Sequence, residues 1–175
     1  MAHSIEHSFS QTEPRIRVFI TGGTFDKEYD ELTGRLYFRE SHLPEMLTLG
    51  RSTVGLVVTT LFMIDSLEMT AAQREHIVSQ CREVEESRIV ITHGTDTMAE
   101  TARQLEAKAP GKTIVLTGAM VPYKFGSSDG MFNLGSALAF AQTLPAGVYV
   151  AMNGRCFPAQ LVEKNSATGL FDARR

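Results

Sequence analysis

Short apolar runs alternate along the chain with longer amphipathic stretches. β-branched and aromatic residues dominate these runs, which occupy 16–20, 55–61, 89–92, 113–117 and 147–152. Runs of this length that end at glycine or polar residues are typical of buried strands. The intervening stretches carry apolar residues at helical spacing and predict helices over 71–86, 98–108 and 132–143, with a short helix over 41–47.

The alternation of strands and helices predicts an α/β fold: a doubly wound, mostly parallel sheet with helices on both faces, in a single domain. We expect this domain to span 15–175. Residues 1–14 are polar and lack the apolar centre of a signal peptide, so we expect a flexible leader there. Residues 155–175 show no clear hydrophobic period.

Two of the predicted strands end in glycine followed by threonine. Thr24 follows Gly22 and Gly23, and the pair Thr95 and Asp96 follows Gly94. Parallel strands share one carboxyl edge, where small ligands bind, so these turns and the loop at 65–66 should meet in one crevice. The Thr24 hydroxyl is a candidate nucleophile, the Thr95 backbone N–H a candidate oxyanion donor, and Asp96 a candidate partner for a substrate ammonium. The alternative is that these side chains cap the segments that follow.

The residues after Thr24 predict a hairpin-like flap over 26–38, with its turn at Thr33 and Gly34, although an ordinary surface loop is the alternative. A threonine hydroxyl needs an activating partner. Tyr29 in the flap is one candidate, and a lysine with a pKa lowered by burial is another. From its neighbours alone, Lys164 is typical of a solvated surface lysine.

The composition excludes several classes of protein. An apolar fraction of 43%, a charged fraction of 21% and a net charge of −3 are typical of soluble globular proteins and favour neither a nucleic-acid nor a membrane partner. Cys81 and Cys156 lie far apart, which indicates free thiols and a reducing, cytoplasmic location. The five histidines lack zinc-motif spacing, so we expect no metal and no cofactor. His93 is interpreted as a packed histidine rather than a base, and 111–113 is rejected as a phosphate loop because it precedes its strand.

The motifs together resemble those of the bacterial L-asparaginases. The signatures are Thr-Gly-Gly-Thr at 21–24 and His-Gly-Thr-Asp-Thr-Met at 93–98, and further matches lie at 118–122, 129–134, 152–153 and 162–164. The resemblance covers about 15–172. It implies a threonine nucleophile that attacks a side-chain amide, forms an acyl-enzyme, releases ammonia and then yields aspartate.

The resemblance also implies a role for each matched residue. Thr24 is the implied nucleophile and Tyr29 its activating partner, with Tyr37 as the alternative flap tyrosine; Thr95, Asp96 and Lys164 form a second catalytic group. Ser66 would bind the substrate carboxylate, Asp96 the α-ammonium, and the Ala119 carbonyl the leaving amide. The full set of implied substrate-binding residues is Gly23, Asp65, Ser66, Gly94, Thr95, Asp96 and Ala119.

The sequence departs from the family pattern at Leu67, where some relatives carry a polar substrate contact, and in its length. It resembles the short-chain, single-domain asparaginases and stops where typical members begin a second domain, so we expect a homodimer whose second copy completes the site. A fragment of a longer enzyme is an alternative for the chain. For the activity, the alternatives are an amino-acid-binding or regulatory module that has lost catalysis, and an L-glutaminase.

Overall fold

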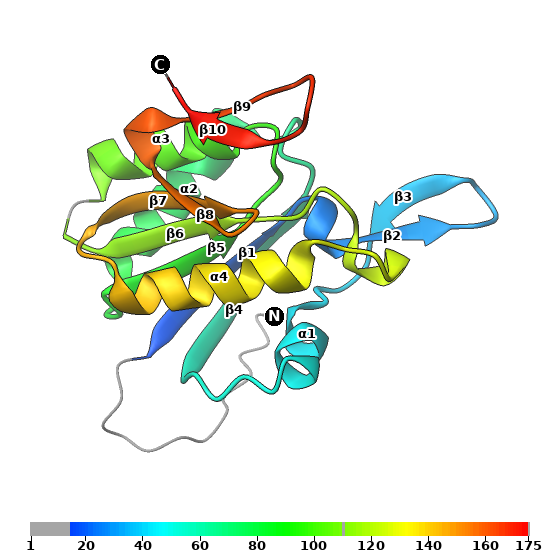
Figure 1. Cartoon of the computed structure of the whole chain (residues 1–175), viewed down its shortest axis with the longest axis horizontal. Helices are drawn as coiled ribbons and strands as arrows, with labels where there is room; N and C mark the ends of the chain where they lie inside the picture. The colour runs from blue at the N-terminus through cyan, green and yellow to red at the C-terminus, as the bar shows by residue number, and fades with distance from the viewer. Residues whose placement is uncertain (1–14, 110, 175) are drawn as a thin grey trace.

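The structure, a computed structural model, describes residues 15–109 and 111–174. Its centre is a six-stranded sheet in the order β4-β1-β5-β6-β7-β8 (Figure 1). The bounds of these strands are β1 (Ile16–Gly22), β4 (Leu56–Ile64), β5 (Arg88–Thr92), β6 (Thr113–Thr117), β7 (Gly147–Met152) and β8 (Arg155–Pro158). All neighbours pair in parallel except β7 and β8. The predicted fold class is confirmed.

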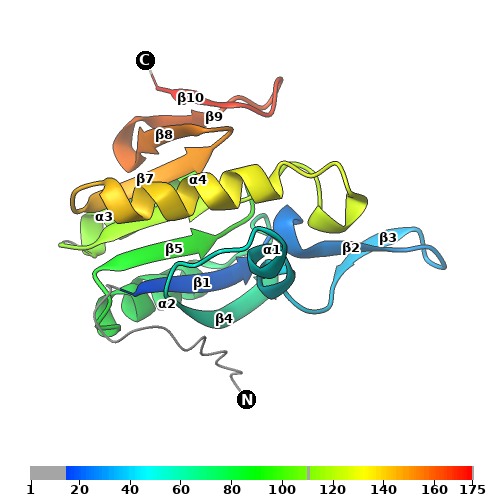
Figure 2. The same cartoon turned by 60° about the horizontal axis from the view of Figure 1, so that its bottom comes forward.

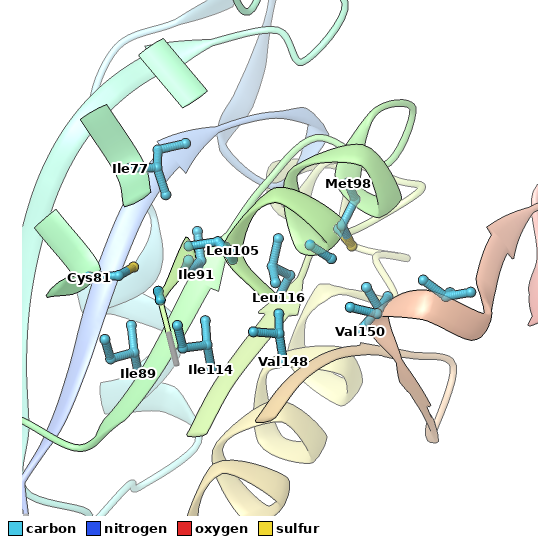
Figure 3. Close-up of a cluster of buried hydrophobic side chains, with 14 of the residues drawn as sticks. Ile77, Cys81, Ile89, Ile91, Met98, Leu105, Ile114, Leu116, Val148 and Val150 are labelled. Carbon is cyan, nitrogen blue, oxygen red and sulfur yellow. The ribbon is translucent and has the colours of Figure 1, made fainter. Parts of the chain in front are cut away.

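Helices cover both faces of the sheet (Figure 2). The helices α2 (Ala71–Glu83) and α3 (Met98–Lys108) pack on one face, and α1 (Leu43–Leu49) and α4 (Gly130–Thr143) on the other. Successive residues of a strand point to opposite faces. Ile89 and Ile91 therefore join the core under α2 and α3, whereas Val90 joins the core under α4. Figure 3 shows the first of these cores, with Ile77 of α2 and Leu105 of α3 beside side chains of the sheet.

The helix α2 begins with a capping box. The Thr70 hydroxyl accepts from the Gln73 N–H at 3.3 Å, and the Gln73 side chain accepts from the Thr70 N–H at 2.9 Å. The helix ends at Glu83, earlier than predicted, because Val84 is extended and Glu86 binds Arg17 of β1 at 2.8 Å. The strand β4 instead runs on to Ile64, past its predicted end.

The predicted flap is a two-stranded hairpin made of β2 (Lys27–Asp30) and β3 (Arg35–Phe38). The Asp30 carboxylate closes its turn by accepting from the Leu32 N–H at 2.9 Å and the Thr33 hydroxyl at 2.7 Å, and Gly34 has a φ of +68°. Figure 1 shows the hairpin projecting from the body of the domain beyond the carboxyl edge of the sheet.

The carboxyl-terminal segment is ordered into short elements that its sequence did not predict. After β8 come the single turn η3 (Ala159–Leu161) and the antiparallel pair β9 (Val162–Lys164) and β10 (Phe171–Ala173). Val162 and Phe171 are buried in the core that contains α3. These contacts fasten β9 beside α3 and thereby direct Lys164 toward the end of β5.

Some sequence-based expectations concern other parts of the chain. The predicted leader at 1–14 lies outside the described residues. Cys81 is buried, Cys156 is half-buried, and both are free thiols. Within the described ranges, no helix combines the length and the apolar character that a bilayer crossing needs.

Candidate active site

The two glycine–threonine turns lie in direct backbone contact. The strands β1 and β5 are neighbours, with Ile20 paired to Thr92, so both turns leave the same edge of the sheet. A Cβ added to Gly23 would lie 2.5 Å from the Gly94 Cα, and a Cβ added to Gly94 would lie 2.5 Å from the Ser66 Oγ. Only glycine permits this approach, which brings the Thr24, Ser66 and Thr95 segments together.

Lys164 reaches the second turn from the carboxyl-terminal hairpin. Its Nζ donates to the Thr95 Oγ1 at 2.8 Å and to the Asp96 Oδ1 at 2.6 Å. The lysine side chain is 16% exposed, so its interpretation as a solvated surface lysine is wrong. Thr95 is buried as well. An ammonium, a hydroxyl and a carboxylate are thus held together at this end of β5.

The capping alternative for Thr95 and Asp96 is also wrong. The N-cap of α3 is Thr97, which makes no side-chain cap bond, and its hydroxyl instead donates to the Ser66 carbonyl at 3.0 Å. Thr95 and Asp96 precede that cap, and their side chains accept hydrogen bonds from Lys164 instead.

Thr24 opens the single turn η1 (Thr24–Asp26) directly after β1. Its side chain is half-buried, and within the described part of the chain its hydroxyl has no hydrogen-bond partner. Asp26 anchors the turn: its Oδ1 accepts from the Ser41 hydroxyl at 2.8 Å and the His42 N–H at 2.9 Å. Burial raises the pKa of Asp26 to about 6, although these hydrogen bonds act in the opposite direction.

Among the described residues, neither flap tyrosine is hydrogen-bonded to Thr24. Tyr29 pairs with Leu36 across the hairpin and is 54% exposed. Its hydroxyl lies 3.9 Å from the Cβ position of Gly34, at the tip of the hairpin. The Tyr37 hydroxyl donates to the Glu28 Oε2 at 3.0 Å within the same flap.

The loop after β4 carries a feature that sequence reasoning missed. Asp65 forms an ion pair of 2.5 Å with Lys27, the first residue of β2, and its other oxygen accepts from the Leu67 N–H at 2.9 Å. Burial tends to raise the pKa of Asp65, but these hydrogen bonds outweigh burial and hold the pKa below its ordinary value. The Ser66 hydroxyl is buried and has no partner among the described residues. A lysine three residues after a candidate nucleophile was the available signal.

The loop after β6, with the buried Ala119, is held by the start of α4. Both oxygens of Asp129 accept from the Met120 N–H, at 3.0 and 3.1 Å. The Asn133 side-chain amide donates to the Gly118 carbonyl at 2.9 Å and to Asp129 at 2.8 Å. Sequence reasoning matched these residues to a motif without assigning them this supporting role.

His93 supports the second turn from inside the core. Its Nδ1 lies 2.8 Å from the Gly94 carbonyl, which can only accept, so Nδ1 carries the proton. The Thr101 hydroxyl therefore donates to Nε2 at 2.9 Å and itself accepts from Arg74 at 3.3 Å. Burial lowers the pKa of His93 to about 4, so the ring is neutral at pH 7. The predicted packed role is confirmed.

Other candidates lie apart from these groups. Among the described residues, no cluster of His, Cys, Asp and Glu side chains could hold a metal ion. Lys112, in the rejected phosphate-loop motif, precedes β6 and donates to the Val84 carbonyl at the amino edge of the sheet.

The fold and these groups define an α/β domain with two threonine turns and a half-buried lysine at the carboxyl edge of its sheet. Residues 15–173 match the family model described as "Asparaginase, N-terminal", and the chain belongs to this family. It is 33% identical over 175 residues to L-asparaginase 1 of Escherichia coli, covering 90% of this chain and 49% of the relative. It is 32% identical over 160 residues to a glutamyl-tRNA(Gln) amidotransferase subunit of Thermofilum pendens, covering 85% of this chain and 35% of the relative.

The solved structures agree with the sequence matches. The thermostable L-asparaginase from Thermococcus kodakarensis superposes with a TM-score of 0.80 at 29% identity, over 91% of this chain and 51% of that chain. The chain therefore spans between about a third and a half of the length of these two curated relatives.

Proposed function

We propose that the protein is an L-asparagine amidohydrolase that converts L-asparagine and water into L-aspartate and ammonia. The observation that carries the proposal is the joining of Lys164 to Thr95 and Asp96 beside the Thr24 turn. Family membership supports the same proposal, because relatives in the family are named L-asparaginases.

In the proposed reaction, the Thr24 Oγ attacks the carbon of the substrate side-chain amide and loses its proton. The C–N bond then breaks, ammonia leaves with that proton, and an ester to Thr24 remains. Water hydrolyses the ester, which restores the hydroxyl and releases aspartate. The support is that the Thr24 hydroxyl is half-buried and bonded to no other described residue. A nucleophile committed to a structural hydrogen bond would be less available.

Thr95 and Lys164 form the second catalytic group of the proposal. The lysine ammonium donates to the Thr95 hydroxyl and thereby fixes its orientation. This hydroxyl and the Thr95 N–H are proposed to stabilise the developing oxyanion and to position the attacking water. Tyr29 is proposed to assist Thr24 only when the flap folds over the site.

Substrate recognition is proposed to use the three loops that meet at this edge. Asp96 takes the α-ammonium, the loop at Asp65 and Ser66 takes the α-carboxylate, and the Ala119 carbonyl accepts from the side-chain amide. The backbones of Gly23 and Gly94 line the floor between them. Charged hydrogen bonds of this kind contribute specificity as well as affinity.

We further propose a cytoplasmic homodimer whose second copy covers the open side of the site. Support comes from apolar side chains exposed around it: Leu67, next to Ser66, is 71% exposed, and the flap adds Leu32 and Leu36. Exposed apolar side chains that form a contiguous patch are typical of protein–protein interfaces. Sedimentation of the native chain and of Leu67→Lys tests this: the substitution should favour the monomer.

The central test is ammonia release from L-asparagine by the native chain and by Thr24→Ala. Release by the native chain alone, with an adduct on Thr24 after incubation with an activated asparagine analogue, supports the proposal. Equal release by both contradicts it. Binding of aspartate without turnover would favour the amino-acid-binding module. Faster ammonia release from L-glutamine than from L-asparagine would favour a glutaminase. The two substrates differ by one methylene group, which a pocket typically discriminates by only ~1–3 kcal/mol.

A further inference from the structure

We propose that Met120 is an oxidation-sensitive modification site, at which a peroxide converts the thioether to a sulfoxide and thereby disables the pair formed by Thr95 and Lys164. The inference goes beyond the proposed function, although the activity that the modification would control rests on that function. Neither the composition nor the family motifs assigned a role to the sulfur of Met120.

The first argument is the contact between this sulfur and the second threonine. The Thr95 hydroxyl donates to the Met120 Sδ over 3.5 Å, while its oxygen accepts from the Lys164 Nζ at 2.8 Å. A hydroxyl has a single hydrogen, so the sulfur holds the one that Thr95 can offer. Because a thioether is a weak acceptor, this hydrogen stays available to turn toward an oxyanion or an attacking water.

The second argument is the fixed position of Met120. Both oxygens of Asp129 accept from its backbone N–H, and Oδ1 also accepts from the Val121 N–H at 3.0 Å. On the other side, a Cβ added to Gly169, in the turn between β9 and β10, would lie 3.0 Å from the Met120 Cε. The methionine side chain therefore lies between the end of β5 and the carboxyl-terminal hairpin, with its sulfur held beside Thr95.

The third argument is the exposure of this side chain, which is 40%. Among the methionines of 15–109 and 111–174, the others are less exposed: Met46, Met69, Met98 and Met152 are buried, and Met63 and Met131 are half-buried. Hydrogen peroxide is smaller than an amino acid, so it reaches the sulfur through the opening that admits a substrate. Exposure favours oxidation at Met120 over the buried methionines.

The fourth argument is the chemistry of the product. A lone pair of the sulfur attacks one peroxide oxygen, so that the S–O bond forms, the O–O bond breaks and water leaves. The sulfur is oxidised by two electrons and the peroxide is reduced to water. The sulfoxide oxygen is a far better acceptor than the thioether and sits on the atom that already contacts Thr95. It would hold the Thr95 hydrogen and compete for the Lys164 ammonium, so the oxyanion would lose this support.

The competing interpretation is that Met120 only fills space between two loops and that a peroxide harms the protein elsewhere. The two interpretations differ in what happens when the sulfur is absent. If Met120 is the sensitive site, a protein with leucine at this position resists peroxide. If the damage lies elsewhere, it loses activity as fast as the native chain.

The experiment treats the native chain, Met120→Leu and Met131→Leu with hydrogen peroxide over a time course. Peptide mass spectrometry locates the added oxygen, and ammonia release from L-asparagine is measured on the same samples. The sulfoxide should form first at Met120, and native kcat should fall in step with it by about 100-fold, as when a donor to the oxyanion is lost. Met131, the matched control, packs against the core under α4, so Met131→Leu should start at native activity and lose it at the native rate.

Met120→Leu should lower the starting kcat by less than about tenfold, because leucine and methionine have similar volumes, and peroxide should then change it little. Methionine sulfoxide reductase with dithiothreitol should restore the oxidised native chain, since this enzyme reduces the sulfoxide back to the thioether. Dithiothreitol alone, which reverses mild oxidation of the free thiols Cys81 and Cys156, should restore nothing.

The assignment is overturned by a first sulfoxide at another methionine, by equal loss in the native chain and Met120→Leu, or by full activity with Met120 oxidised. In each case ammonia release before treatment would still support the amidohydrolase. If the untreated native chain releases no ammonia, the amidohydrolase proposal fails, and L-aspartate binding by calorimetry replaces kcat as the readout. Weaker binding after oxidation, confined to the proteins that retain Met120, would then support the assignment, whereas unchanged binding or none at all would overturn it.

Discussion

The ammonium of Lys164 donates a hydrogen bond of 2.8 Å to the hydroxyl of Thr95, which lies 69 residues earlier in the chain. The contact joins β9, in the last part of the chain, to the end of β5 in the middle of the sheet. Val162 and Phe171, on the hairpin formed by β9 and β10, are both buried and hold the backbone next to this lysine in place. The geometry of the proposed second catalytic group thus depends on the packing of the carboxyl-terminal segment.

Replacing Lys164 with methionine tests this group directly. Loss of the ammonium leaves Thr95 without its donor and Asp96 without its partner, so kcat should fall roughly 10²- to 10³-fold, as is typical when support for the developing oxyanion is lost. The measurement is steady-state ammonia release with L-asparagine. Lys124→Met changes one surface lysine and should retain native kcat. An unchanged kcat in Lys164→Met would remove the lysine from the mechanism.

Single and double substitutions of the two threonines test whether they act as one unit. Thr24→Ala and Thr95→Ala should each reduce kcat by several orders of magnitude, and the double substitution should cost little more than the worse single one. Mass spectrometry of each protein after exposure to an activated asparagine analogue locates the acyl group. An adduct on Thr95 in the Thr24→Ala protein and in the native chain would exchange the two proposed roles.

The five strand positions of the parallel sheet could be predicted from the sequence because each strand contains an apolar run, most clearly where both faces are buried, as in β5 and β6. A strand such as β6, with every residue buried, leaves a continuous apolar run that no loop would carry. The elements β8, β9 and β10 could not be predicted, since strands of three or four residues are too short to show a period of two. The positions of these elements depend instead on Val162 and Phe171, which are buried in a core formed by residues distant in sequence.

The candidate site divides in the same way. Thr24 and Thr95 are visible in sequence because each follows a strand and a glycine, and neighbouring strands must bring them to one edge. The pairings of Lys164 with Thr95 and of Lys27 with Asp65 are not visible, because these partners lie 69 and 38 residues away. Charge pairs of this separation leave no local pattern. The resemblance to a family predicted the role of Lys164, whereas only the structure showed the ion pair of Lys27 with Asp65.

The contact between the two turns predicts a steric effect at Gly23. Alanine there would place its Cβ 2.5 Å from the Gly94 Cα, and the φ of +80° is unfavourable for any other residue. We expect Gly23→Ala to lower the free energy of unfolding by about 1–3 kcal/mol, in line with strained backbone positions. The control is Gly135→Ala in α4, where nothing lies within 4 Å of the added Cβ and helix propensity favours alanine.

Urea denaturation of both glycine variants checks this prediction. The Gly135→Ala midpoint should stay level with that of the native chain or rise, because alanine exceeds glycine by about 0.5–1 kcal/mol within a helix. The Gly23→Ala midpoint should fall without a change in the m-value. Equal midpoints for the two variants would mean that the turns do not pack as the structure describes.

Asp26 predicts a dependence of stability on pH. Burial raises its pKa in the folded protein to about 6, above the ordinary value of 3.8. The folded state therefore binds the proton more tightly than the unfolded state does, and this stabilisation is present below about pH 4 and lost as the pH rises through 6. The ionised carboxylate at neutral pH also leaves its buried Oδ2 without a partner among the described residues.

Asparagine at position 26 retains an oxygen for the Ser41 hydroxyl and the His42 N–H but carries no charge. The free energy of unfolding of the native chain, relative to Asp26→Asn, should therefore fall by about 2–3 kcal/mol between pH 4 and pH 7. His42 titrates nearby, with its pKa lowered chiefly by burial, but it is present in both proteins, so its own contribution largely cancels. Urea unfolding of both proteins at half-unit pH steps measures the difference. A difference that stays flat, or rises with pH, would show that the Asp26 carboxyl ionises as readily in the folded protein as in the unfolded chain.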